Sequence, residues 1–181
     1  MSKIKRSLQA VFLNVSPDAE TETWARVGVG VTDMSIAYNP QVKTEQDVTQ
    51  DTADSEVVGY QPNLPVTQTA KKGDPVYGYI NELRRKRATF DDCKTQLLIV
   101  DLYDGDKNSG YKAEKQDVTV QIDSYGGAGS DPLSIGYTMN FVGDATTGTF
   151  NATTSTFTAD DEAAASAVSD EGDEGDEAAA E

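Results

Sequence analysis

The chain has 181 residues, a formal net charge of −16, one cysteine and no histidine. This length predicts one domain that can bury a core without disulfides. Cys93 has no partner for an internal disulfide, and without histidine neither a Ser–His nor a Cys–His nucleophile can form. We therefore expect Cys93 to fill a small buried space.

Residues 1–7 carry Lys3, Lys5 and Arg6 and are predicted to form an N-terminal arm. Two interpretations remain open, a loose terminus or an arm that docks on an acidic neighbour. The segment lacks the apolar stretch of a signal peptide, and no apolar run in the chain is long enough for a transmembrane helix. We expect a protein that is made in the cytoplasm and has no membrane contact.

Residues 8–15 are predicted to form the first strand, and residues 24–31 the second. In the second, Val27, Val29 and Val31 alternate with Gly28 and Gly30. Glycine on one face leaves that face bare, so either another segment packs closely against it or the strand bends there.

Residues 41–61 are polar and are predicted to form a long projecting hairpin. A segment this polar cannot pack on its own core, and ordering it costs roughly 1–2 kcal/mol per residue. It is therefore either a floppy loop or an assembly element that gains order only against another copy. Its acidic residues are Glu45, Asp47, Asp51, Asp54 and Glu56.

Residues 75–88 are predicted to form the one helix. Asp74 is a favoured N-cap residue and Pro75 suits the first helical position. An apolar stripe follows at helical spacing. Four basic residues end the helix, and they form a solvated terminus, a subunit contact or a nucleic-acid patch. These are Arg84, Arg85, Lys86 and Arg87.

The remaining chain is predicted to be rich in strands. Residues 97–100 are apolar on both faces, which favours a central strand. Residues 118–122 and 133–141 alternate between apolar and polar side chains on either side of a glycine-rich connection. Their apolar face requires a covering layer. The fold class is therefore mainly β, with one flanking helix.

Two segments resemble known sites but lack essential residues. Residues 104–110 begin like a calcium loop, yet Ser109 stands at the sixth position and Lys115 at the twelfth, where glycine and glutamate are required. The glycines of residues 126–129 lack the lysine of a phosphate loop. We predict no catalytic residues, no metal and no cofactor.

Residues 159–181 are predicted to form a disordered acidic tail, because they offer no apolar surface to bury. The segment holds ten acidic residues and no basic one. We expect it to be dispensable for folding.

The order of these elements over residues 8–158 resembles the major tail proteins, or tail tube proteins, of long-tailed bacterial viruses. The resemblance is carried by Trp24-Ala25-Arg26-Val27-Gly28, Tyr38-Asn39-Pro40, Gly73-Asp74-Pro75, Leu98-Ile99-Val100-Asp101-Leu102, Val120-Gln121-Ile122-Asp123, Asp131-Pro132-Leu133 and Gly143-Asp144. It implies an antiparallel β-sandwich or barrel of two packed sheets. It also implies rings of six subunits, stacked around a channel that holds a tape-measure protein and then the viral DNA.

The same resemblance implies that the chain itself is the main partner, together with tail terminator and tip proteins, in a virion tail. We expect the self-assembly contacts to join the hairpin acids of one copy to basic residues of another. The basic candidates are Lys3, Lys5, Arg6, Arg84, Arg85, Lys86 and Arg87. Two alternatives remain, a head-decorating or adhesion module that forms no tube, and a calcium-dependent enzyme or binding domain.

Overall fold

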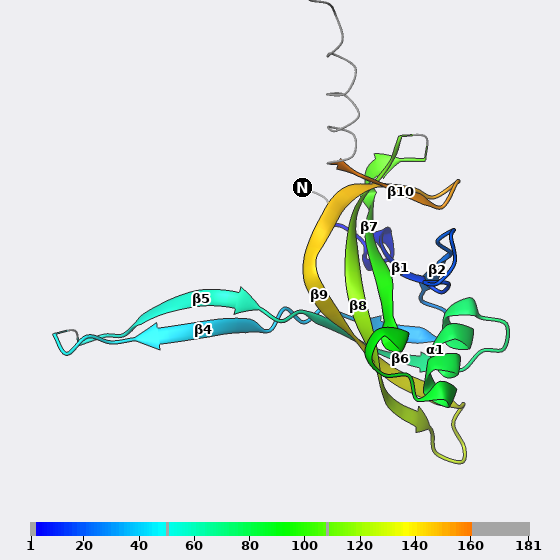
Figure 1. The fold of residues 1–181 in the computed structure, drawn as a ribbon, viewed down its shortest axis with the longest axis horizontal. Helices are drawn as coiled ribbons and strands as arrows, with labels where there is room; N and C mark the ends of the chain where they lie inside the picture. Colours follow the sequence, from blue (N-terminus) through cyan, green and yellow to red (C-terminus); the bar gives the residue numbers. More distant parts are fainter. Residues whose placement is uncertain (1–2, 50, 108, 161–181) are drawn as a thin grey trace, which may run out of the picture.

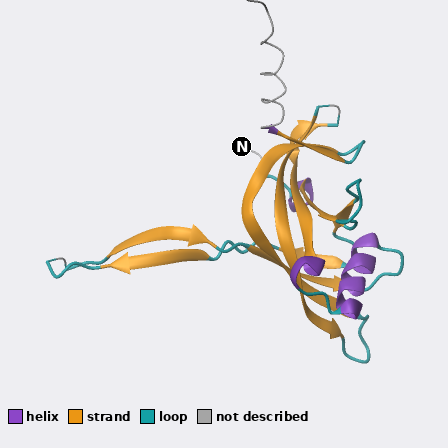
Figure 2. Ribbon diagram, viewed as in Figure 1, coloured by secondary structure: helices purple, strands orange, loops and turns teal. Residues whose placement is uncertain are grey.

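The computed structural model of the chain describes residues 3–49, 51–107 and 109–160. Figure 2 shows that strands and loops make up most of the described part, with one α-helix and two short 3₁₀ helices. In chain order the elements are η1 (Arg6–Leu8), β1 (Gln9–Asn14), β2 (Trp24–Val27), β3 (Val31–Met34), β4 (Pro40–Glu45), β5 (Asp54–Tyr60), β6 (Asn63–Thr69), α1 (Pro75–Lys86), η2 (Phe90–Cys93), β7 (Lys94–Asp106), β8 (Gly110–Gly126), β9 (Ser134–Asn151) and β10 (Thr156–Ala159). The predicted mainly-β class is confirmed.

Eight of the described strands form one antiparallel sheet in the order β2-β1-β7-β8-β9-β6-β3, with β10 beside β9. The sheet curls into a half-barrel, and α1 lies to one side of it (Figure 1). The expected sandwich or barrel therefore takes the form of one curled sheet. The second sheet consists of β4 and β5 alone and projects away from the body.

The alternating segments of β8 and β9 pair with each other as predicted. Val118 and Val120 lie in register with Phe141 and Met139. All four belong to, or pack against, a core cluster that also contains buried side chains of α1. The period of two in the sequence thus places one face of these strands beneath the helix.

The central position predicted for residues 97–100 is confirmed. They lie in β7, which pairs with β1 on one side and β8 on the other. Leu97 and Ile99 join the cluster that packs against α1. Leu98 and Val100 join a second cluster on the opposite face, together with Phe150. Both faces of β7 are therefore covered.

A bulge interrupts the pairing of β8 with β9. Lys115 pairs with Thr146 and Asp117 with Val142, so residues 143–145 lie opposite Gln116 alone. The Gln116 side chain is buried, and its Nε2 donates to the backbone oxygen of Val142 at 2.8 Å. A second contact, to the backbone oxygen of the next residue, is 3.3 Å long. The amide thus supplies a donor where the strand pairing is interrupted.

The predicted strand over residues 24–31 is wrong in its extent. β2 ends at Val27, and residues 28–30 form a turn that leads into β3. Gly30 has φ +78°, and a Cβ atom there would lie 2.5 Å from the backbone oxygen of Thr69. Glycine at this position permits the left-handed turn and the close approach of β6. Both interpretations left open therefore apply in part: the chain bends at residues 28–30, and β6 packs closely against Gly30.

The predicted ends of the domain also differ from the structure. Arg6 and Ser7 of the expected arm lie in η1, and Ala159 of the expected tail is the last residue of β10. The remaining acidic tail, apart from Asp160, lies outside the described residues, as do residues 1 and 2.

The helix begins as predicted. The Asp74 Oδ2 atom accepts from the Tyr77 backbone N–H at 2.9 Å and from the Gln68 Nε2 at 2.7 Å. Gln68 is fully buried in β6, so the N-cap also ties the helix to the sheet. The helix ends at Lys86, before the predicted limit at residue 88, because Arg87 adopts a left-handed backbone with φ 52°.

We predict that Asp74→Ala lowers the free energy of unfolding by roughly 2 kcal/mol, because it removes the N-cap and one partner of a buried amide. Asp74→Asn keeps an acceptor oxygen at the same place and serves as the control. Chemical denaturation of both variants tests this prediction. Equal stability of the alanine and asparagine variants would show that the cap contributes little.

Candidate assembly surfaces

The hairpin formed by β4 and β5 is uncovered. Every side chain of β4 is exposed, and so is every residue of β5 except Gly59. The two strands nevertheless pair with each other within the single chain. The backbone pairing of the hairpin is thus made within the single chain, and the dependence of its order on another copy stays a prediction. What the single chain does not supply is burial of the hairpin's side chains.

The register gives the hairpin two different faces, because directly opposed residues project to the same side. One face is uncharged and consists of Val42, Thr44, Ser55 and Val57. The other is charged and consists of Lys43, Glu45, Asp54 and Glu56. Val42 and Val57 are 57% and 51% exposed, so two valines stand side by side in solvent.

The neck that joins the hairpin to the body is braced. Asn39 has φ 44° and donates from Nδ2 to the backbone oxygen of Gln61 at 3.0 Å. The Gln61 backbone N–H in turn donates to the Tyr38 oxygen at 3.2 Å. The rings of Tyr38 and Tyr60 meet edge to face at 6.4 Å between centroids. These contacts fix the direction in which the hairpin leaves the sheet.

The basic end of α1 is organised by aromatic rings. The Arg84 guanidinium lies 3.8 Å from the centroid of the Tyr125 ring, and its Nε donates to Asn81 Oδ1 at 3.0 Å. Such a cation–π contact favours a fixed side-chain position. A hydrogen bond with Tyr125 and, to a lesser degree, burial raise the pKa of Tyr77 above its usual value. This cluster joins α1 to the far end of β8.

The other basic residues of this end differ in their surroundings. Lys86 forms an ion pair with Glu82 at 2.7 Å, which raises the pKa of the lysine and lowers that of the glutamate. The Arg87 backbone N–H donates to the oxygens of Leu83 and Arg84, which closes the last turn. Arg85 is exposed.

The N-terminal basic residues also differ in whether their side chains bond to the chain. Lys3 and Lys5 are exposed. Arg6 donates from Nη1 to the Gln9 oxygen at 2.9 Å and from Nη2 to the Met34 oxygen at 3.1 Å. Arg6 therefore binds its own chain at β3.

The structure does not bring the predicted acidic and basic partners together within one chain. The hairpin projects from one side of the sheet, and the basic end of α1 lies on the other (Figure 1). The hairpin's Glu45 pairs locally with Lys43. Asp47 and Asp54 also have partners within the chain, whereas Asp51 and Glu56 are exposed. Contacts between the two groups require a second copy.

A polar face covers the side of β6, β8 and β9 that points away from α1. Asp123 accepts from Gln121 Nε2 and from Thr138 Oγ1, each at 2.7 Å. Asn140 donates to Gln121 at 3.4 Å. Residues 63–69, 119–123 and 134–140 contain no lysine or arginine. The face is thus a hydrogen-bonded, cation-free surface.

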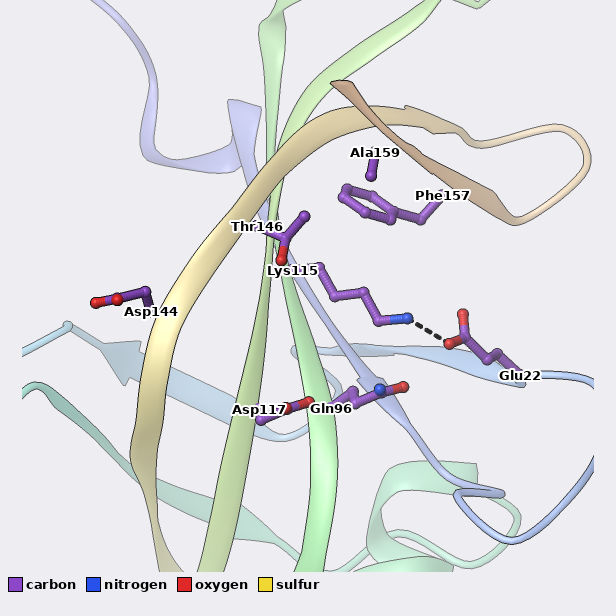
Figure 3. A pocket seen from close by; sticks show the side chains of 8 residues that line it. All are labelled: Glu22, Gln96, Lys115, Asp117, Asp144, Thr146, Phe157 and Ala159. Carbon is purple, nitrogen blue, oxygen red and sulfur yellow. Dashed lines mark hydrogen bonds and ion pairs between the residues drawn. The ribbon is translucent and has the colours of Figure 1, made fainter. Parts of the chain in front are cut away.

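A lysine near the other end of the sheet lines a cavity of about 350 Å³ (Figure 3). Lys115 of β8 forms an ion pair with Glu22, which lies just before β2. Its Nζ also lies 5.7 Å from the centroid of the Trp24 ring and 5.9 Å from that of Phe157. The side chain is 22% exposed, so these contacts are partly shielded from water. Lys115 therefore joins β2, β8 and β10.

Sequence reasoning missed this cluster. In the sequence, Lys115 was considered only as a wrong residue in a calcium loop. Its partners come from segments that are far apart in the chain, and no local pattern links them. The signal available was weak: Lys115 stands in a run of polar residues, 114–117, directly before the alternation of residues 118–122.

The fold is similar to those of solved tail proteins. One is a chain in the tail of an empty gene transfer agent particle, computed with helical refinement and C6 symmetry; the TM-score is 0.56 at 12% identity, over 87% of this chain and 100% of that chain. A chain of the native gene transfer agent virion gives 0.54 at 12% identity, over the same shares. The tube-terminating cap of the anti-feeding prophage gives 0.51 at 13% identity, over 82% and 93%. These similarities show a shared fold.

Comparisons of the sequence add nothing to this result. No protein-family model matches the chain, and no curated protein matches it.

The chemistry of the described residues is limited. No group of three or more His, Cys, Asp or Glu side chains among them is placed to hold a metal ion. Residues 104–110 end β7 and begin β8, so the calcium-like sequence lies at a connection between two strands. Cys93 is buried, and its Sγ donates to the Phe90 oxygen at 3.0 Å. No described helix has the length and apolar character to cross a membrane.

We predict that Gly148→Ala releases β10 from β9. A Cβ atom there would lie 2.3 Å from the Thr158 oxygen and 2.6 Å from the Phe157 ring, so the strand must shift. We expect a loss of about 1–3 kcal/mol in unfolding free energy and faster amide exchange in β10.

The matched control is Gly78→Ala in α1, where an added Cβ meets nothing within 4 Å. This variant should gain about 0.5–1 kcal/mol, because alanine is the better helix former. Unchanged exchange in β10 of the Gly148 variant would contradict the prediction.

Proposed function

We propose that this chain is the repeating subunit of a tail tube, a structural protein without catalytic activity. The single observation that carries the proposal is the shared fold with a tail chain of a particle refined in C6 symmetry, over the full length of that chain. Six copies would form a ring, and the rings would stack into a tube. The unburied hairpin side chains supply a surface for such contacts.

In this proposal the cation-free polar face of β6, β8 and β9 lines the channel. DNA binds proteins mainly through lysine and arginine contacts to its phosphates. A face of amides, hydroxyls and Asp123 offers no cation to the DNA phosphates. The DNA can therefore pass through the channel without binding to its wall. The formal charge of −16 points the same way.

The proposed partners follow from the same role. The chain binds other copies of itself, and tail terminator and tip proteins close the two ends of the tube. A tape-measure protein fills the channel before DNA. The location is a virion tail, assembled from subunits that are made in the host cytoplasm.

The hairpin gives the stacking contact in two parts. Its uncharged face packs on a neighbouring copy, where Val42 and Val57 lose their exposure to water. Its charged face and loop acids meet basic residues of that copy, with Arg85 as one of the exposed members of the helix cluster. Exposed ion pairs contribute only ~1 kcal/mol or less each, so the charges set register and the valines set affinity.

We predict that replacing residues 44–55 by a short glycine-serine linker leaves a folded subunit that forms no long tubes. The main sheet contains no hairpin strand, so its circular dichroism and thermal midpoint should change little. Electron microscopy of the purified wild-type chain and the variant tests this. Tubes of normal length and stability from the variant would contradict the assembly role. Isolated wild-type monomers or trimers would contradict the proposed function itself.

A charge exchange tests the ionic part. We predict that Arg85→Glu and Glu56→Arg each slow tube growth several-fold, and that the double variant recovers much of the wild-type rate. Restored growth identifies the two positions as neighbours across copies. Light scattering measures the rate of tube growth. The measurement is repeated at several salt concentrations, because salt screens exposed ion pairs. If the growth rate of the double variant falls by the product of the two single-variant factors, the two residues do not contact each other across copies.

A further inference from the structure

Phe90 is held in an unfavourable conformation while its side chain points into solvent. It begins η2, has φ 53° and is 88% exposed. A bulky side chain with a left-handed backbone is an outlier, because its Cβ crowds the following carbonyl. The Phe90 backbone oxygen accepts from the buried Cys93, but the ring itself is left in solvent. Strain that persists at an exposed aromatic residue points to a role in binding.

The surroundings of Phe90 fix its position. The buried Cys93 donates from Sγ to the Phe90 oxygen at 3.0 Å. The Asp92 backbone N–H donates to the Thr89 oxygen at 3.2 Å. Asp91 forms an ion pair with Lys94 at 2.6 Å. The turn is therefore braced on the residues before and after the ring, and it presents Phe90 as a fixed projection.

A cavity of about 620 Å³ lies elsewhere on the chain, where β2 turns into β3 beside η1. Its apolar lining includes Val29, Val31 and Met34. A Cβ atom on Gly28 would meet nothing within 4 Å, so the cavity is open above this glycine. Val29 is 46% exposed. The cavity is open to solvent, and its volume is ample for a phenyl ring.

Charges beside the ring and the cavity are complementary. Phe90 is followed by Asp91 and Asp92, which are both exposed. The charged residues that line the cavity are Arg6, Arg26 and Asp33, so two cations stand beside one carboxylate. Asp91 already pairs with Lys94, whereas Asp92 is an exposed carboxylate directly beside the projecting ring. An aromatic residue followed by two acids therefore matches a cavity with apolar side chains and a net positive charged lining.

We propose that Phe90 of one copy inserts into the cavity at Gly28, Val29 and Met34 of the next copy, with Asp92 facing Arg26. The inference rests on the proposed self-assembly and names one of its contacts. Ring and cavity are different patches of one chain, so the contact is heterologous. Each copy carries one donor and one acceptor, and the contact repeats until a ring closes.

Phe90→Asn tests the proposal, because asparagine tolerates the left-handed conformation and lacks the ring. We expect an unchanged or higher thermal midpoint for the monomer, together with about a tenfold higher concentration needed for assembly. The control is Leu133→Asn, which removes another exposed apolar side chain, 42% exposed, from a loop. Normal assembly of the Phe90 variant would overturn the inference.

Cross-linking between copies gives a readout that does not depend on stability. Chains with Phe90→Cys and chains with Val29→Cys are mixed and oxidised, and we expect a disulfide-linked heterodimer. Wild-type chains control for Cys93, and a mixture of Phe90→Cys with Leu133→Cys controls for random collision. No excess of the heterodimer over these controls would overturn the contact.

The two tests separate this inference from the proposed function. If the wild-type chain forms tubes while Phe90→Asn assembles normally and no specific cross-link appears, the Phe90 contact is wrong and the tube proposal stands. If the wild-type chain forms neither rings nor tubes and no specific cross-link appears, both are wrong.

Discussion

The two longest described strands, β8 and β9, pair across a bulge at which the buried amide of Gln116 bonds to backbone oxygens of β9. At the bulge, residues 143–145 lie opposite Gln116 alone, and the side-chain Nε2 of Gln116 donates to the backbone oxygens of Val142 and Gly143. A hydrogen bond of this kind contributes about 0.5–1.5 kcal/mol to stability. The bulge bends β9, and the buried side of the strand changes along its length. Before the bulge Met139 packs toward α1, and after it Phe150 packs into the cluster on the opposite face. β8 and β9 thereby contribute side chains to both hydrophobic clusters.

Much of this architecture could be predicted from the sequence, because burial of a strand face leaves a period of two and a helix start leaves a capping residue. The β8–β9 pair, the central β7 and the N-cap at Asp74 are such cases. The sequence left open whether the chain bends at residues 28–30, because the approach of Thr69 to Gly30 comes from a segment distant in the chain. The pairing of β4 with β5 leaves no burial signal in the sequence, since the two strands are joined by backbone hydrogen bonds and their side chains stay exposed. The cluster around Lys115 and the projection of Phe90 depend on long-range contacts and a single backbone angle, and neither has a local pattern.

The uncovered surfaces share one property. Contacts within the chain hold each of them in position, yet most of their side chains stay exposed to solvent. The hairpin is held by its neck, Arg84 is held by Tyr125, and Phe90 is held by Cys93. Positions fixed in advance lose little conformational entropy on association, so modest contact areas can be enough for binding. The division of charge also sets the direction of association. The acidic hairpin of one copy attracts the basic helix end of another, whereas two hairpins or two helix ends repel each other. A chain with these features is suited to ordered repetition.

The braced neck of the hairpin also has a mechanical consequence. β5 leads through Pro62 directly into β6, and β6 pairs with β9 from Asn63 to Thr69. Hydrogen bonds of an antiparallel pair run across the strands, so a pull along β6 loads all of them side by side rather than one after another. Tension applied to the hairpin is therefore carried in shear by the longest strand of the sheet. A polymer linked through this arm would resist stretching through backbone pairing, even though each contact between its side chains is weak.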